Sequence, residues 1–245
     1  MLRTKLLQLN RQTKTTIMKK ILLPVVICIT AISLTAFTSL APKPKLNAGV
    51  EKYYAGLLAK PDAKHISALH DVSSYITQGM SSDHKITIVF TCPDNSFKSI
   101  AAQIVLQSLL SLDKTNKLTT ASFSNHPANV SPQLLKVLAA HGFIVNDAAA
   151  VVSGQKAYDI KFGENMPSLI VYARGADDGA IPKNNFFLMK LCGADESSCA
   201  DLPGASYTSS LPFSKIAVTL SDEEAEKQFT EIAAEIVYAF NQSKP

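Results

Sequence analysis

One stretch decides the expected fold of this chain: Ile86-Thr-Ile-Val-Phe-Thr-Cys92-Pro-Asp-Asn-Ser-Phe-Lys98-Ser-Ile-Ala-Ala102. Its apolar first half predicts a strand that ends at a cysteine, and a short polar loop then leads into a helix that begins near Lys98. A helix N-terminus presents unpaired backbone N–H groups and the positive end of the helix dipole, so it favours a bound oxyanion and lowers the pKa of a neighbouring cysteine. The stretch therefore predicts an anion-binding loop around a Cys92 thiolate.

Strands and helices alternate along the rest of the chain. One helix is marked by Ser131 as N-cap, Pro132 at its first position and Gly142 just past its end, and apolar residues at helical spacing over 229–240 mark another. This alternation predicts a three-layer α/β/α fold around a central, mostly parallel four-stranded sheet, with ligands beyond the carboxyl ends of the strands, where Cys92 lies. Further strands are expected at residues 117–124, 157–162, 168–173 and 186–191.

The amino-terminal segment differs in composition from the rest. Residues 1–41 carry six of the 24 Lys and Arg residues and none of the 20 Asp and Glu residues. The remainder is slightly acidic, which argues against a nucleic-acid partner. Lys19 and Lys20 precede an uncharged run over 21–41, which predicts a cleaved signal for export to the periplasm or the medium. The same run is long enough to remain as an inner-membrane anchor, and this alternative stays open.

Three regions follow from these patterns. Residues 1–41 are expected to be the signal peptide or membrane anchor. Residues 42–82 are expected to be a Pro- and Lys-rich linker followed by a helical extension, with helices that start near Asn47 and Asp62. Residues 83–245 are expected to form the α/β domain.

Two cysteines late in the chain, Cys192 and Cys199, are seven residues apart. In an exported protein such a pair favours a structural disulfide. The spacing is not that of a metal site, because no His lies nearby and the His residues are scattered. We expect neither a metal nor an organic cofactor. The five His residues are His65, His70, His84, His126 and His141.

The loop also resembles a known motif. Cys92, Asn95 and Ser99 match a Cys-x5-Arg-Ser loop that has Asn three places after the Cys, with Lys98 where that motif has Arg. The turn over 124–132 and the order of motifs from residue 84 to 242 extend the similarity. The chain thus resembles the low-molecular-weight protein tyrosine phosphatases and thioredoxin-coupled arsenate reductases, and most of all a phosphatase-like subgroup of Bacteroidetes-type bacteria.

The resemblance to the phosphatases implies nucleophilic chemistry. A thiolate at the Cys92 position attacks phosphorus, and Lys98 together with the loop amides binds the oxygens of the phosphate-like oxyanion. Ser99 is expected to donate a hydrogen bond to the thiolate. The positions that the resemblance assigns to anion binding are Asp94, Asn95, Ser96, Phe97 and Lys98.

The resemblance to the arsenate reductases implies a redox role for the other two cysteines. In that chemistry the first cysteine attacks arsenate, and a second and third cysteine, here Cys192 and Cys199, pass a disulfide outward. An exported protein would need a thioredoxin-like partner in its own compartment to accept that disulfide.

Several residues depart from the family pattern. Lys98 cannot clamp two oxygens as Arg does, Pro93 removes a backbone N–H, and Asp94 adds a negative charge beside the anion site. Ala217 and Val218 stand where the family has the Asp-Pro pair that supplies its general acid. Phosphoester hydrolysis through Cys92 is therefore expected to be weak or lost. An arsenate reductase-type redox enzyme and a non-catalytic binding protein are the alternatives.

Overall fold

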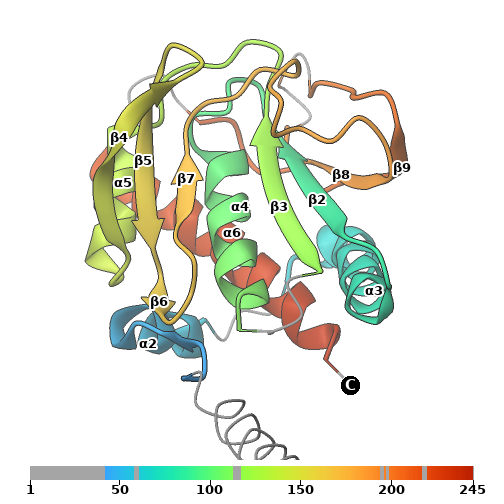
Figure 1. The fold of residues 1–245 in the computed structure, drawn as a ribbon, viewed down its shortest axis with the longest axis horizontal. Helices are drawn as coiled ribbons and strands as arrows, with labels where there is room; N and C mark the ends of the chain where they lie inside the picture. The colour runs from blue at the N-terminus through green and yellow to red at the C-terminus, as the bar shows by residue number, and fades with distance from the viewer. Residues whose placement is uncertain are drawn as a thin grey trace, which may run out of the picture. The chain divides into compact units, whose positions relative to one another are not determined.

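The computed structural model describes residues 42–57, 61–112, 117–193, 196, 199–216 and 220–244. Residues 44–245 form one compact unit (Figure 1). The predicted signal or anchor at 1–41 lies outside the described residues. Among the helices that the structure describes, none is both long enough and apolar enough to cross a membrane.

The centre of the fold is a four-stranded parallel sheet. Its strands are β2 (Ile86–Thr91), β3 (Leu118–Phe123), β8 (Phe186–Lys190) and β9 (Ala205–Ser210), in the order β3-β2-β8-β9. The predicted α/β class and the parallel four-stranded sheet are confirmed. The strand before Cys92 lies inside the sheet, between β3 and β8, so the loop that follows it starts from a fixed point.

Helix α4 (Lys98–Leu110) is buried along almost its whole length. It packs against β2 and β3 of the parallel sheet, against the long C-terminal helix α6 (Asp222–Gln242) and against β7, as Figure 1 shows. The apolar residues of α4 occur on every side of the helix, and such a helix has to be enclosed in this way. The enclosure extends to its first turn, which carries Lys98 and Ser99.

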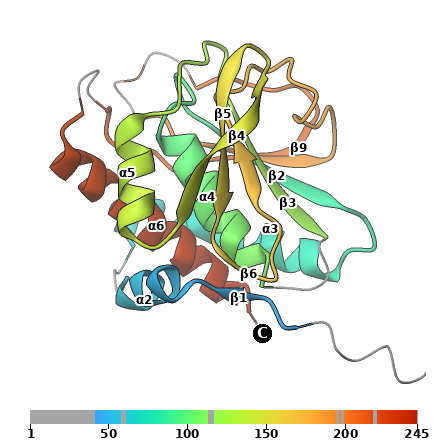
Figure 2. The ribbon, with the colours of Figure 1, turned by 60° about the vertical axis from the view of Figure 1, so that its left-hand side comes forward.

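A second, antiparallel sheet lies beyond α4 and was not expected as a separate unit. It contains β4 (Ile144–Val152), β5 (Gln155–Lys161) and β7 (Leu169–Val171), in the order β4-β5-β7 (Figure 1). Figure 2 shows β4 and β5 from another side. The predicted strands at 157–162 and 168–173 therefore exist, but they belong to this sheet. The turn between β4 and β5 has positive φ at Ser153 and Gly154, which is typical of a two-residue hairpin.

The fourth strand of the parallel sheet is β9, which the sequence did not predict. Its residues, Ala-Ser-Tyr-Thr-Ser-Ser, are mostly polar and partly exposed because β9 is an edge strand. On the face away from α4, Val89 and Leu188 pack with Ile181 and Ala200. Among the described residues this third layer consists of connecting segments instead of helices.

The helices before β2 belong to the same compact unit. Helix α2 (Ala48–Gly56) and helix α3 (Ile66–Ser81), with the short 3₁₀ turn η1 (Ala63–His65) before α3, contribute side chains to the main core. The Tyr54 hydroxyl hydrogen-bonds the Ser108 hydroxyl on α4 at 2.8 Å. A short pair, β1 (Lys45–Leu46) with β6 (Gly163–Glu164), joins the linker to the end of β5.

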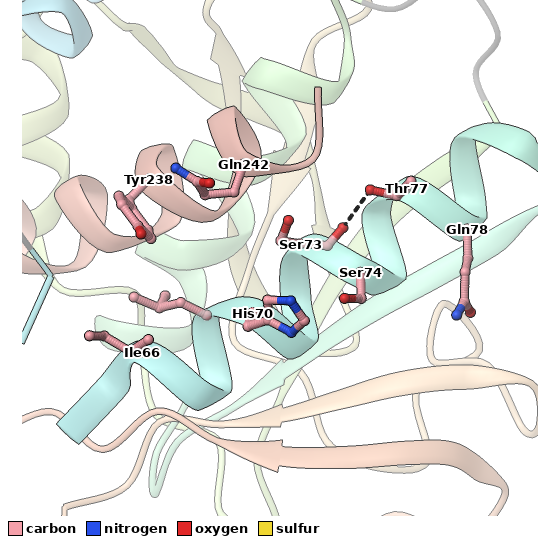
Figure 3. Close-up of a pocket in the computed structure, with 9 residues that line it drawn as sticks. Ile66, His70, Ser73, Ser74, Thr77, Gln78, Tyr238 and Gln242 are labelled. Atoms are coloured by element: carbon pink, nitrogen blue, oxygen red, sulfur yellow. Dashed lines mark hydrogen bonds between the residues drawn. The ribbon is translucent and has the colours of Figure 1, made fainter. Parts of the chain in front are cut away.

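Helices α3 and α6 also leave a groove of about 470 Å³ between them (Figure 3). His70, Ser73 and Thr77 line it from α3, and Tyr238 and Gln242 line it from α6. It shares no lining residue with the Cys92 loop. The remaining helix, α5 (Pro132–Ala140), begins as predicted, with the Ser131 hydroxyl accepting the Leu134 N–H and Pro132 in the first turn.

Candidate functional site

The loop between β2 and α4 is fixed from beneath by Asn95. This residue is fully buried and has φ 48°, a left-handed conformation that Asn tolerates better than most residues. Its side-chain amide donates to the Ser99 hydroxyl at 2.7 Å and accepts the Arg174 backbone N–H at 2.7 Å. The loop is therefore held in one conformation by buried hydrogen bonds.

Cys92 lies beneath this loop and does not face the solvent. It is 1% exposed and belongs to the main apolar core. Its Sγ lies 3.0 Å from the Ser99 hydroxyl, as the resemblance predicted, and 3.7 Å from a carboxylate oxygen of Asp94.

These surroundings affect the pKa of Cys92 and therefore its expected charge state. Burial raises the pKa of the Cys92 thiol, and the Asp94 carboxylate raises it further, whereas the Ser99 hydrogen bonds and the Lys98 charge lower it. Burial dominates, so at neutral pH the residue is a protonated thiol. The burial of Cys92 therefore argues against the ionised thiolate that the sequence predicts at the mouth of the loop.

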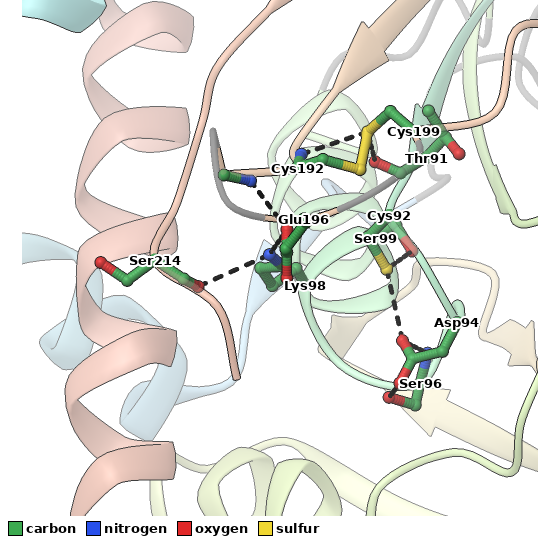
Figure 4. A network of polar contacts seen from close by, with 11 residues as sticks. Thr91, Cys92, Asp94, Ser96, Lys98, Ser99, Cys192, Glu196, Cys199 and Ser214 are labelled. Atoms are coloured by element: carbon green, nitrogen blue, oxygen red, sulfur yellow. Dashed lines mark hydrogen bonds and ion pairs between the residues drawn. A yellow bond between two sulfur atoms is a disulfide. The ribbon is translucent and has the colours of Figure 1, made fainter. Parts of the chain in front are cut away.

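Lys98 is also buried, with 3% of its side chain exposed. Its ammonium group lies 2.5 Å from the carboxylate of Glu196 and 3.5 Å from the backbone carbonyl oxygen of Ser214 (Figure 4). The same Glu196 oxygen accepts the Gly193 N–H at 2.7 Å. The cation that the resemblance assigns to a substrate oxyanion is thus paired with a carboxylate of the protein.

Asp94 occupies a second part of the expected anion site. One carboxylate oxygen accepts the Ser96 backbone N–H at 3.1 Å, and the other accepts the Ser96 hydroxyl at 2.7 Å. This is a local side-chain turn of the kind that Asp commonly forms. Because Pro93 has no N–H, the first half of the loop offers few amides to an anion.

The Cys192–Cys199 pair forms a disulfide, as one of the two alternatives predicted. Cys199 Sγ lies 3.6 Å from the Thr91 carbonyl oxygen, and the Leu191 N–H donates to that same oxygen at 2.9 Å. Thr91 directly precedes Cys92. The disulfide therefore packs over the end of β2, one residue from the buried thiol.

A groove of about 330 Å³ opens beside the loop. Asp94, Ser96 and Phe97 line it from the loop, and Ser131 and Gln133 line it from the start of α5. Asp94 is the only charged side chain among its described lining residues. The described lining of this groove therefore carries one negative side chain and no positive one.

Sequence reasoning assigned no role to Glu196, although this residue lies between Cys192 and Cys199. The site also includes Arg174, whose guanidinium is buried, donates to the Ile170 carbonyl at 2.9 Å and lies 4.1 Å from the centre of the Tyr172 ring. Ala217 and Val218, at the place of the family's general acid, lie outside the described residues. Among the residues that the structure describes, no group of three or more metal-ligating side chains comes together.

Comparison with known proteins gives weak similarity. No family model and no curated protein matches the chain. Among solved structures, an arsenate reductase from Archaeoglobus fulgidus has 15% identity and a TM-score of 0.40 over 64% of this chain and 99% of its own. A thioredoxin-dependent arsenate reductase from Corynebacterium glutamicum has 14% identity and a TM-score of 0.37. The match covers 80% of this chain and 85% of the reductase. At these values neither match carries an argument about what this chain does.

Two substitutions should move the reactivity of Cys92 in opposite directions. Asp94→Asn removes a charge that raises the thiol pKa, so alkylation by iodoacetamide at pH 7.5 should become about three- to tenfold faster. Ser99→Ala removes hydrogen bonding that lowers the pKa, so alkylation should slow by a similar factor. The rates are read by mass spectrometry of the Cys92 peptide in native protein. Alkylation of the unsubstituted protein at the rate of a free cysteine would contradict the buried, protonated thiol.

Proposed function

We propose that this chain is a phosphatase-like protein of the low-molecular-weight phosphatase and arsenate reductase kind, in which the protein's own carboxylates fill the oxyanion site. Phosphoester hydrolysis through Cys92 is then slow. The observation that supports this proposal is the buried ion pair between Lys98 and Glu196.

Two physical effects reduce turnover in this arrangement. A phosphate group has to displace the Glu196 carboxylate before Lys98 can bind it, so substrate affinity falls. Cys92 also has to lose a proton from a buried position near Asp94, and the thiol is a far poorer nucleophile than the thiolate. Loss of one oxyanion donor alone costs about 10²- to 10³-fold in rate in other enzymes.

A cation at position 98 that is not paired with a carboxylate should increase phosphoester hydrolysis. The double variant Lys98→Arg with Glu196→Gln should hydrolyse para-nitrophenyl phosphate at least about tenfold faster than the unsubstituted protein, because a free guanidinium binds two oxygens at once. Adding Cys92→Ser to the double variant should abolish the gain. The measurement is kcat/KM from the release of para-nitrophenol.

An exposed ion pair provides the matched control. Lys156 and Asp147 are 3.0 Å apart on the second sheet, and Lys156→Arg with Asp147→Asn makes the same chemical changes there. This control should leave hydrolysis unchanged. If the Lys98 and Glu196 variant is no faster than the control, the proposal that Glu196 suppresses turnover fails.

A second candidate function, arsenate reduction, is favoured by the disulfide. In the arsenate reductases that the loop resembles, the cycle ends with the first cysteine as a free thiol and the other two joined. Here Cys92 is free and Cys192 is joined to Cys199. A dithiol reductant, such as an exported thioredoxin-like protein, would have to reopen that disulfide for another turnover.

Arsenate should oxidise the reduced protein if this candidate holds. After reduction and removal of the reductant under nitrogen, addition of arsenate should convert the thiols of Cys192 and Cys199 into their disulfide and release one arsenite per chain. Peptide mapping and arsenite determination measure the two products. Cys92→Ser should block both. Arsenate reduction would be excluded if the thiols persist after arsenate is added. It would also be excluded if they are lost to the same extent in a sample without arsenate.

A further inference from the structure

The groove between α3 and α6 is lined by uncharged side chains. Its described lining contains no Lys, Arg, Asp or Glu. Surface helices commonly carry charged residues on their outer face, and Ser and Thr are weaker helix formers than Ala, Glu or Lys. The lining residues of α3 recur at helical spacing and so form one face of the helix. They are Ile66, Leu69, His70, Ser73, Ser74, Thr77 and Gln78.

The two helices are tied together at both ends of this groove. At one end, Nδ1 of the buried His65 lies 2.7 and 2.8 Å from the two carboxylate oxygens of Glu235 on α6. At the other end, the Thr77 hydroxyl donates to the carbonyl oxygen of Ser243 at 3.3 Å. These ties fix the distance between the walls before a ligand arrives, and a site formed in advance lowers the ordering cost of binding.

Ser73 is a buried polar residue of the lining. It is 6% exposed, and Figure 3 places it on the side of α3 that faces Tyr238 and Gln242 of α6. Its carbonyl oxygen accepts the Thr77 hydroxyl at 3.0 Å. Its own hydroxyl makes no hydrogen bond to any residue that the structure describes. Because buried polar groups are rarely left without a partner, this hydroxyl has to be satisfied from within the groove.

Four more polar side chains of the lining are available in the same way. The hydroxyls of Ser74 and Tyr238 and the amides of Gln78 and Gln242 make no hydrogen bond within the described part of the chain. Hydroxyl and amide groups can both donate and accept. The Tyr238 ring adds an aromatic surface beside them. The volume of about 470 Å³ is within the range of small-molecule sites, about 300 to 1,000 Å³.

This set of groups favours one chemical class of ligand. An anion or a cation would leave water without meeting an opposite charge in the described lining, which is unfavourable. A purely apolar ligand would leave the Ser73 hydroxyl without a hydrogen bond. A sugar is neutral, its hydroxyls donate and accept as the lining groups do, and the C–H face of its ring can pack on an aromatic side chain.

We propose that the groove between α3 and α6 binds a small neutral saccharide of one or two rings. The hydroxyls of Ser73 and Ser74 and the amide of Gln242 bond the sugar hydroxyls, and the Tyr238 ring packs against the sugar ring. This site is separate from the Cys92 loop, because the two share no lining residue. The saccharide is bound without a covalent step.

The test uses the full chain and named sugars. Saturation-transfer difference NMR is titrated with glucose, galactose, mannose, N-acetylglucosamine, maltose and cellobiose. At least one of them should bind with a dissociation constant of about 1 mM or less. Glucuronate, which adds a charge, and cyclohexanol, which has a single hydroxyl, should both bind more weakly than that sugar.

Substitutions at two positions locate the binding. Ser73→Ala and Gln242→Ala should each weaken the best sugar about three- to tenfold, as expected for the loss of one hydrogen bond. Ser67→Ala and Asn241→Ala are the matched controls, because these exposed residues lie on the same two helices outside the groove lining. The controls should bind as the unsubstituted protein does. Ser73→Ala should also leave the rate of Cys92 alkylation unchanged.

Three results would overturn the inference. The first is that none of the six sugars binds with a dissociation constant of about 1 mM or less. The second is that glucuronate or cyclohexanol binds as tightly as the best sugar. The third is that Ser73→Ala and Gln242→Ala bind that sugar as tightly as their controls. Because no turnover is measured, absence of phosphoester hydrolysis contradicts the proposed function alone.

Discussion

The site depends on the burial of helix α4. Because α4 lies between the parallel sheet, α6 and β7, its first turn is also enclosed, and that turn begins with Lys98. An ammonium group removed from water is stable only with an opposite charge and further hydrogen bonds. Glu196 supplies the charge, and the Ser214 carbonyl lies 3.5 Å away. The charge of Lys98, the residue that the resemblance assigns to an oxyanion, is in this way neutralised within the fold.

The same enclosure accounts for Cys92. It leaves the sheet at the carboxyl end of β2, where a loop would normally present it, but the apolar core closes around it. Asn95 and Ser99 keep the geometry that the family resemblance implies, while Pro93, Asp94 and Lys98 change the charges and donors. The contacts among Cys92, Asn95 and Ser99 are therefore kept within the loop, and the surrounding charges favour a neutral thiol and an ion pair inside the protein.

The sequence predicted the elements whose signals are local. The apolar run before Cys92, the N-cap at Ser131 and the helical spacing over 229–240 all gave the correct elements. The sequence did not predict the strands whose formation depends on tertiary packing. Strand β9 is polar because it forms an edge, and β4 is rich in Ala, so neither shows the alternation of a buried strand.

The sequence predicts which residues form the candidate loop, but it does not predict their surroundings. The sequence placed Cys92, Asn95, Lys98 and Ser99 in one loop, and the structure places them together. Whether the loop amides face solvent, and which carboxylate meets Lys98, depends on segments about 100 residues apart in the chain. No short pattern around Glu196 marks it as the partner, because the contact with Lys98 is made only when two distant segments of the chain meet in the fold.

The most direct measurement is a double-mutant cycle on the free energy of unfolding in urea, with Lys98→Met and Glu196→Leu singly and together. The account predicts that each single variant loses about 3 to 5 kcal/mol, because it leaves a buried charge unpaired, and that the double variant loses much less than the sum. Additive losses, or single losses below about 1 kcal/mol as for an exposed pair, would show that Lys98 and Glu196 do not form the buried pair on which the account rests.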